Sequence, residues 1–532
     1  MRQPLYGTPN SAQLDPIRAQ PEANGYTVPA PVGGWNARDP LAGMKPTDAI
    51  FLNNFYPTPS QVAVRPGCAL WESVPVNGNP LLNALGYAGA DGSTKLFGTT
   101  NQGIYDLSTG GGGTQSTIAY ALTSGQVQAV NFVNSGNTYL WGCNGQDPAF
   151  YYSSAAGWTA ATITGVSSSS ISNVSVYQSR LMLIPKRSMS FWYLGLNAIQ
   201  GAASEFPMGS FFTLGGYLVA SDTWTYTTIM GVQKYFCIIT SQGEVAVYSG
   251  NDPSLSTNWS LVGIYYVGVP VGNRPFVRVG TDLCVMTANG LVPMSKAVQS
   301  ATDDRSIFYT DKIQPAFATM VQSWGGNYGW KAVLFPSQTA LIVNVPLTTA
   351  GSVTPISNQI VMNTQSGSWC LFTGWNASDF LSFNSALYFT SGYSLYQAWT
   401  GTSDAGVTIT AQAKTAFNMA GSSNLKHVSL VRPIFTSNMA VQYQLGLDMD
   451  FDNMDFSPDV DSSGLVGGTA VWDQAVWDQA VWASSNTTSK TWQTVPNNSG
   501  IYFALRLQIL ASGGTFSWSA TNYLLQVGGQ LG

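Results

Sequence analysis

The most regular feature of the sequence is a pair of short apolar segments joined by a turn that contains glycine. Residues 235–240 and 244–248 flank Gly243, and after a period of about forty residues the segments 282–287 and 291–294 flank Gly290. In both pairs the first segment is apolar at successive positions, which is typical of a strand covered on both faces. Each pair therefore predicts a buried β-hairpin with a tight turn.

The same pattern recurs along most of the chain between about residues 84 and 400. With the two pairs above there are seven hairpin signals, and the other five lie in 96–107, 139–152, 180–194, 340–375 and 386–399. Hairpins at a long, regular period are typical of the blades of a β-propeller, which has roughly four to eight of them. We therefore predict an all-β fold with a propeller core, without equating seven signals with seven blades. A large β-sandwich or barrel is the alternative.

The segments on either side of the propeller differ from it in composition. Residues 1–30 are rich in Pro, Gln, Asn and Ala, and residues 28–71 hold short apolar pieces separated by Pro and Gly. After residue 404 the strands become long and strictly alternating, which indicates an antiparallel sheet with one solvated face. We expect an N-terminal arm and docking module (1–75), a propeller (76–403) and a C-terminal antiparallel β domain (404–532).

Three stretches inside the propeller depart from the hairpin pattern. Residues 303–324 place apolar side chains at helical spacing, so we expect one or two short helices inserted there. Residues 105–130 and 153–175 are rich in Gly, Ser and Thr, and we expect flexible loops in them.

Composition restricts the partners of the protein. Charged residues are only 9% of the 532, and the net charge is −5, so a grip on nucleic-acid phosphates is not indicated. A surface with so little charge is poorly protected against association, and we expect much of it to be covered by neighbouring subunits. The five cysteines are far apart and form no CxxC or Cys/His cluster. No segment is apolar enough to span a membrane, and we expect a soluble protein made in a reducing cytoplasm.

No catalytic motif is present. The one histidine, His427, lies in a strand-like run, and we expect it to be structural or exposed. There is no GxSxG elbow, HExxH, P-loop or GxGxxG, so we expect no enzyme activity and no cofactor. The basic clusters 186–187 and 426–432 are explained by solvated loops or subunit contacts.

An acidic run is the best metal candidate, and it is a weak one. Asp448, Asp450 and Asp452 begin a series of acids that extends to residue 461. The spacing is superficially that of a calcium loop, but the glycine at the sixth position and the final glutamate are missing. Because apolar residues alternate with the acids, we favour a strand with an acidic outer face, which could also line a channel.

A tandem repeat follows within the C-terminal domain. Trp472, Trp477 and Trp482 lie five residues apart in TAVWDQAVWDQAVWAS, a period that fits neither a helix nor a strand. We expect a loop that holds three indoles against the sheet or against a neighbouring subunit.

Several phrases, in their order, resemble the tail nozzle or hub proteins of short-tailed bacteriophages. The opening module of that family has a "PVGG-N-RD" phrase, a "DA--L-N-FP" phrase and a "V--R-G" strand, and these match residues 31–39, 48–57 and 62–67. The blade phrases SQGEVAVYSGNDP and MNTQSGSWCLFTGWN, and the later VRPIF and WDQAVW, are also similar. The likeness spans nearly the whole chain.

The resemblance implies a structural protein of the virion tail. It implies a homo-oligomeric ring, a hexamer, below the portal and adaptor. The ring would line the channel through which double-stranded DNA leaves without sequence-specific binding, and it would help to retain the packaged DNA before infection. Partners would be the tail adaptor and the tail fibre, spike or needle proteins. We expect Trp35, Arg38, Asp39 and Phe55, with the three tryptophans of the repeat, to contact subunits or partners. The alternative is a glycan-binding or glycan-degrading propeller of a phage tail, although no repeated aspartate box occurs.

Overall fold

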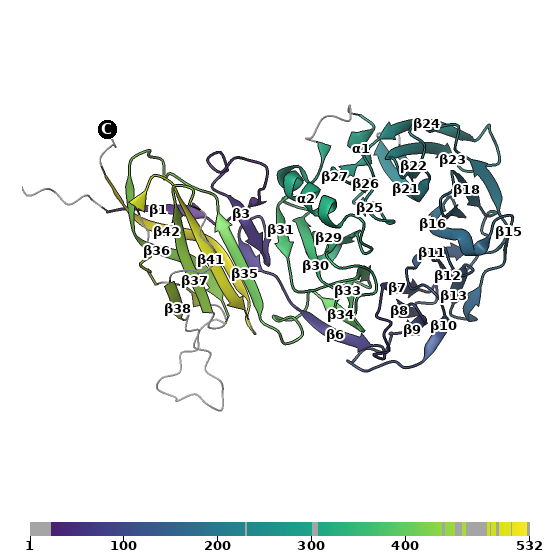
Figure 1. Cartoon of the computed structure of the whole chain (residues 1–532), viewed down its shortest axis with the longest axis horizontal. Coiled ribbons are helices and arrows are strands. Elements are labelled where there is room, and N and C mark those ends of the chain that lie inside the picture. Colours follow the sequence, from purple (N-terminus) through teal and green to yellow (C-terminus); the bar gives the residue numbers. More distant parts are fainter. Residues whose placement is uncertain are drawn as a thin grey trace, which may run out of the picture.

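The computed structural model describes residues 23–228, 231–299, 307–438, 442–452, 460–463, 487–489, 491–495, 499–511 and 513–528. The fold is all-β, as predicted, with a β-propeller core and a second β domain beside it (Figure 1). No helix within these residues is long and apolar enough to cross a membrane.

Seven sheets of the described chain form the propeller, and each is named a blade. Blade 1 contains β7 (Asn83–Ala88), β8 (Thr94–Thr100), β9 (Gly103–Asp106) and β10 (Ile118–Ala121). Blade 2 contains β11 (Gln128–Asn134), β12 (Asn137–Cys143), β13 (Phe150–Ser153) and β14 (Gly157–Ala160). Blade 3 contains β16 (Ile171–Tyr177), β17 (Arg180–Pro185), β18 (Ser190–Tyr193) and β20 (Ser204–Pro207). Blades 4 and 5 are β21 (Leu218–Thr228), β22 (Gly231–Thr240), β23 (Glu244–Gly250) and β24 (Trp259–Tyr266); and β25 (Phe276–Val279), β26 (Asp282–Thr287) and β27 (Gly290–Pro293). Blades 6 and 7 are β28 (Lys331–Phe335), β29 (Ala340–Pro346), β30 (Ser357–Asn363) and β31 (Trp369–Phe372); and β32 (Asp379–Phe383), β33 (Ala386–Ser391), β34 (Ser394–Ala398) and β6 (Cys68–Ser73).

The innermost strands form a closed ring. Each of β7, β11, β16, β21, β25, β28 and β32 contacts the next, and β32 contacts β7 again. Blade 7 is completed by β6, which comes before the first blade in the sequence and pairs antiparallel with β34. The ring is therefore closed by hydrogen bonds between its two ends, so that only the outer edges of the blades stay open.

Each of the seven predicted hairpins lies within one blade. The pairs around Gly243 and Gly290 are β22–β23 and β26–β27, and the other five fall in blades 1, 2, 3, 6 and 7. The second strand of a blade is buried on both faces where the blade packs between two others: β26 and β29 are buried along nearly their whole length, and β22 is buried over residues 236–240. This explains why continuous apolar runs marked them.

The two segments expected to be flexible loops contain further strands. The outer strands β10 and β14 lie in them, together with β15 (Ile163–Thr164) and the start of β16; β15 pairs in parallel with β19 (Gly201–Ala202). The loop prediction was wrong for these residues because the outer strands are short, four residues each in β10 and β14, and lie within stretches rich in Gly, Ser and Thr.

The second domain is a pair of sheets built from both ends of the chain. One sheet contains β1 (Ala23–Pro29), β4 (Phe55–Pro57), β5 (Val62–Val64), β36 (Lys426–Ser437), β39 (Thr487–Thr488), β40 (Ser499–Gly500) and β42 (Phe516–Val527). The other contains β2 (Gly34–Trp35), β3 (Asp48–Asn53), β35 (Ile409–Thr415), β37 (Gln442–Met449), β38 (Val460–Ser463) and β41 (Phe503–Ala511). From residue 23 onward, the segment expected to be a docking module pairs with the C-terminal strands, β1 with β42 and β3 with β35.

The propeller and the second domain share one sheet and one core. The outer strand of blade 6, β31, pairs in parallel with β3, so the sheet of that blade continues into the second domain. One hydrophobic cluster runs through both, and in it Phe55 packs on Trp518 and Tyr56 on Trp399. The short helices η3 (Asp311–Ile313) and α2 (Gln314–Trp324) lie in the segment expected to be helical, and α2 buries Phe317. The remaining helical turns are η1 (Ser168–Ser170), α1 (Met294–Ala297) and η4 (Pro336–Gln338).

Candidate functional site

The innermost strands of five consecutive blades surround a cavity of about 350 Å³ at the centre of the propeller, called the central cavity below. Its wall is strongly polar, because these strands direct amides, hydroxyls and charged groups inward. The polar lining residues are Gln128, Asn131, Asn173, Ser175, Ser221, Asp222, Arg274, Arg278 and Lys331.

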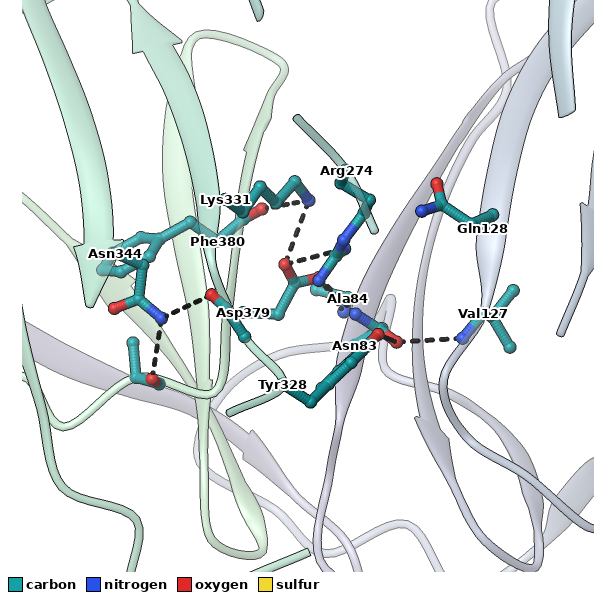
Figure 2. A network of polar contacts seen from close by, with 12 residues as sticks. Asn83, Ala84, Val127, Gln128, Arg274, Tyr328, Lys331, Asn344, Asp379 and Phe380 are labelled. Atoms are coloured by element: carbon teal, nitrogen blue, oxygen red, sulfur yellow. Dashed lines mark hydrogen bonds and ion pairs between the residues drawn. The ribbon is translucent and has the colours of Figure 1, made fainter. Parts of the chain in front are cut away.

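Beside the cavity, the carboxylate of Asp379 is the centre of a buried polar network (Figure 2). Asp379 is fully buried, and its oxygens lie 3.0 Å from Lys331 Nζ and 3.1 Å from Arg274 Nη1. They also accept hydrogen bonds from Asn83 Nδ2 (3.0 Å) and from the backbone N–H of Ala84 (3.2 Å). Burial alone would raise the pKa of Asp379, but the two cations outweigh it and hold the pKa below its ordinary value.

The network joins the ends of several blades. The Asn83 side-chain oxygen accepts hydrogen bonds from the Tyr328 hydroxyl (2.7 Å) and from the backbone N–H of Val127 (3.0 Å). Lys331 Nζ also donates to the Phe380 carbonyl (2.6 Å). Burial lowers the pKa of Lys331 to about 8, with Asp379 opposing the shift and Arg274 adding to it. Blades 1, 2, 6 and 7 are thus linked by hydrogen bonds at their inner ends.

Arg274 is the least satisfied member of the network. Its side chain is 11% exposed and lies over the Tyr328 ring, with the guanidinium carbon 5.4 Å from the ring centre. Nη1 faces Asp379, whereas Nε and Nη2 are buried without any hydrogen-bond partner. Unpartnered buried donors on a charged group are costly and rare, so this guanidinium has hydrogen-bonding capacity that the described chain does not use.

Asp222 is the one carboxylate among the described residues that line the cavity. It is paired with Arg278, which is itself more than half-exposed. Burial raises the pKa of Asp222, and Arg278 opposes the shift. Glycoside hydrolysis ordinarily needs two carboxyl groups that both reach the substrate. Asp379 is enclosed and held by four donors, so the described cavity wall offers Asp222 alone.

A second polar arrangement fixes the connection between the two domains, called the joint below. Asp48, buried at the start of β3, accepts hydrogen bonds from Asn36 Nδ2 (2.8 Å) and from Lys312 Nζ (2.8 Å). Arg38 is ion-paired with Asp39 (2.8 Å) and with Asp311 at the start of η3. The N-terminal segment is therefore held to the helical insertion of the propeller.

Arg65 makes the strongest contact of the joint. Its buried guanidinium donates to both carboxylate oxygens of Asp404 (2.8 and 2.6 Å), to Asn54 Oδ1 (2.8 Å) and to the carbonyls of Pro66 (3.0 Å) and Thr373 (2.6 Å). A bidentate, fully hydrogen-bonded arginine fixes both distance and orientation.

One glycine of the phrases that resemble nozzle proteins is Gly67, which follows Pro66, and its surroundings explain why it is a glycine. A Cβ placed on Gly67 would lie 1.9 Å from the Ser403 carbonyl oxygen, so only glycine fits there. The three opening phrases that resemble nozzle proteins, 31–39, 48–57 and 62–67, thus contribute the contacts of the joint.

The other residues predicted to contact partners have various positions. Trp35 and Phe55 are buried inside the chain, Arg38 is 44% exposed and Asp39 is half-buried. Trp472, Trp477 and Trp482 lie outside the described residues.

The acidic run does not form the outward-facing strand that the alternation suggested. Asp448 is fully buried in β37, 2.6 Å from Arg506 Nε and ion-paired with Lys414. Asp450 and Asp452 follow the end of the strand, where Asp450 accepts hydrogen bonds from the backbone N–H groups of Ile501 (2.8 Å) and Tyr502 (2.9 Å). The prediction of an acidic outer face was therefore wrong for Asp448, whose charge two buried cations balance.

The remaining candidates form no reactive arrangement in the described structure. His427 is exposed, with Nδ1 3.0 Å from the Ser499 hydroxyl. All five cysteines are buried and unbridged. Among the described residues, no three His, Cys, Asp or Glu side chains gather in a way that could hold a metal ion.

Sequence reasoning missed the residues of the central network. Asn83, Lys331 and Asp379 of the network, and Gln128 of the cavity wall, are each the first residue of an innermost strand. The innermost strands of the other three blades begin with Ile171, Leu218 and Phe276, so the polar position recurs in four of the seven blades and can be seen only when the blades are aligned with one another.

Comparisons with known proteins give only remote similarities. No protein-family model matches the chain, and no curated protein does. Solved structures that are similar include the extracellular domain of a putative one-component system from B. thetaiotaomicron, with 10% identity and a TM-score of 0.40 over 68% of this chain and 43% of that one. A streptogramin B lyase has 9% identity and a TM-score of 0.34, over 65% of this chain and 97% of that one. A glycoside hydrolase family 43 arabinoxylan arabinofuranohydrolase from Bacillus subtilis has 10% identity and a TM-score of 0.24, over 86% of this chain and 96% of that one.

This chain thus spans less than half the length of the first of these structures. With every TM-score below 0.5, the similarities carry no argument about activity or ligands.

Proposed function

We propose that this chain is a non-enzymatic structural protein of a phage virion, a subunit of the tail nozzle, and that six copies form a ring around the path of the DNA. The family is suggested by the ordered phrases described above. The structure supports a permanent assembly with one observation in particular, the exposed edge of blade 4.

The outer strand of that blade, β24, is an unprotected edge. It pairs with β23 alone among the described strands, and its sequence WSLVGIYY contains neither a charged residue nor a proline. Leu261, Val262 and Tyr266 are exposed along it, and a single register shift near Val262 is its only irregularity. Native edge strands are usually blunted by charge, proline, β-bulges or covering elements. Of these devices, the described β24 has the bulge at Val262 alone. An edge of this length and composition is suited to continuous contact with a neighbouring subunit.

Two further features fit a subunit that surrounds DNA. The joint and the shared sheet connect the two domains, which suits a subunit that has to keep its shape within a ring. The net charge of −5 with few charged residues repels phosphate and lets DNA pass without binding. In this proposal the ring is located in the virion tail, below the adaptor and beside fibre, spike or needle proteins.

A substitution on the exposed edge of β24 tests the proposal. Val262→Lys adds a charge to the exposed edge, and Val76→Lys is the matched control, because Val76 is more exposed but lies in a loop before blade 1. Each purified chain is incubated with phage particles assembled without this protein, and tail occupancy is counted by electron microscopy. We expect the original chain and Val76→Lys to join the tails and Val262→Lys to fail. Equal occupancy for both variants would contradict the role of the edge, and an original chain that never joins tails would contradict the nozzle proposal itself.

A glycan-binding propeller is the second candidate, and the central cavity is the observation that favours it. Amide and hydroxyl side chains such as Gln128, Asn173 and Ser221 are the groups that bind sugar hydroxyls. Glycan degradation is less well supported, because Asp222 has no second carboxylate beside it on the described cavity wall.

A further inference from the structure

We propose that the central cavity binds a small monocarboxylate that carries hydroxyl groups, such as an acidic sugar. The proposal is independent of ring formation, since the cavity lies inside a single propeller. It rests on the charge balance of the cavity, on the unused donors of Arg274 and on the polar groups of the wall.

The charges in and beside the cavity do not cancel. Arg274, Arg278 and Lys331 are three cations, and Asp222 and Asp379 are the two carboxylates paired with them. One positive charge is left over, although the whole chain carries a net charge of −5. Arg278 is more than half-exposed and is screened by solvent, but Arg274 and Lys331 are mostly buried and share the single carboxylate of Asp379. Uncompensated charge is expensive at a buried site. A single bound anion would balance it, which favours a monoanion over a doubly charged group.

The unpartnered donors of Arg274 indicate where that anion would bind. Asp379 occupies Nη1 only, and Nε and Nη2 have no acceptor in the described structure. A guanidinium edge with two such donors matches the two oxygens of a carboxylate. Both nitrogens are shielded from solvent in the described chain, so the proposal requires the Arg274 side chain to reorient toward the cavity when the anion binds.

The other polar groups on the wall of the central cavity indicate the chemical class of the ligand. Gln128, Asn131 and Asn173 supply amides and Ser175 and Ser221 supply hydroxyls, all from the innermost strands of blades 2 to 4. The Ser175 and Ser221 hydroxyls hydrogen-bond each other, and each of the three amides has at least one intramolecular partner. The remaining donors and acceptors of these groups suit ligand hydroxyls better than an apolar body. A volume of about 350 Å³ is at the lower end of the range for small-molecule pockets, so one monosaccharide-sized ligand fits rather than a polymer.

The test uses the full chain and four probes in isothermal calorimetry at pH 7 and low salt. Glucuronate carries both recognised features, acetate the carboxylate alone, glucose the hydroxyls alone, and inorganic phosphate a different oxyanion. We expect saturable binding of glucuronate, at least about tenfold weaker binding of acetate, and none of glucose. If glucuronate does not bind at millimolar concentration, the proposal is overturned. Phosphate binding as tight as that of glucuronate would overturn the carboxylate class.

Matched variants locate the binding. Gln128→Glu places a negative charge on the cavity wall without removing any partner of Asp379, so the network keeps its contacts. Gln242→Glu makes the same change at an exposed turn of blade 4, away from the cavity. We expect Gln128→Glu to weaken glucuronate binding at least about tenfold and Gln242→Glu to leave it unchanged. Equal affinity in both variants would show that glucuronate binds elsewhere and would overturn the proposal.

Discussion

Replacing Arg65 with methionine tests whether the joint holds the propeller and the second domain together. Methionine keeps much of the length of the side chain but removes the guanidinium, which is fully buried and makes five hydrogen bonds. The mostly buried carboxylate of Asp404 then loses both guanidinium donors and keeps the weaker hydrogen bond from the Trp375 indole N–H, at 3.2 Å. Removing one partner of a buried ion pair costs about 3–5 kcal/mol, because the other charge stays buried without compensation.

The matched control is Arg38→Met, in the same joint. Arg38 also pairs with two carboxylates, but it is 44% exposed, so solvent screens the pairs and the loss is about 0–1 kcal/mol. Urea unfolding is followed by tryptophan fluorescence, which reports on the buried Trp375 beside Arg65 and on Trp518 in the second domain. We expect the two domains of the original chain to unfold in one transition and those of Arg65→Met to separate into two. If Arg65→Met costs no more than Arg38→Met, the reasoning about the joint is refuted.

Two further predictions concern the other buried charges. Asp448→Leu leaves Lys414 and Arg506 facing each other without their shared carboxylate, so we expect a loss of about 3–5 kcal/mol in the free energy of unfolding; a urea midpoint equal to that of the original chain would contradict it. Glucuronate affinity should fall as pH rises through about 8, because Lys331, which faces Arg274 and Asp379, loses its proton there and the cavity loses its excess positive charge. Calorimetry between pH 6.5 and 9.5 checks this, and a flat profile contradicts it.

The parts of the fold that could be predicted from the sequence are those buried on both faces. Strands such as β26 and β29 are largely apolar runs, because each lies between neighbouring strands in a blade that packs against two others. The glycines in the turns between these strands then identified the hairpins and the period at which the hairpins repeat. The outer strands β10 and β14 could not be found in this way, because residues at partly or fully exposed positions can be either polar or apolar.

The pairing of the two ends of the chain was out of reach for a different reason. The sequence of β1, ANGYTVP, has no apolar pattern of its own and is defined by its partner β42 near the other end of the chain. Local sequence does not specify such long-range pairing. Asp448 illustrates the same limit, since the cations that balance it come from β35 and β41.

The candidate sites were predictable only in part. Arg65 lies in a phrase that the resemblance singled out, but its partner Asp404 follows the last blade. The central network joins residues such as Asn83, Arg274 and Asp379, which come together only because the ring of blades closes. Their charge pairing is a property of the closed propeller and of no single segment.

Native mass spectrometry of the purified chain, alone and mixed with tail extract, tests the central claim most directly. The proposal predicts a closed ring of six copies, formed either by the chain alone or on the tail. A chain that stays monomeric at tens of micromolar and ignores the tails would contradict it, and would favour the glycan-binding propeller if it also bound surface polysaccharide.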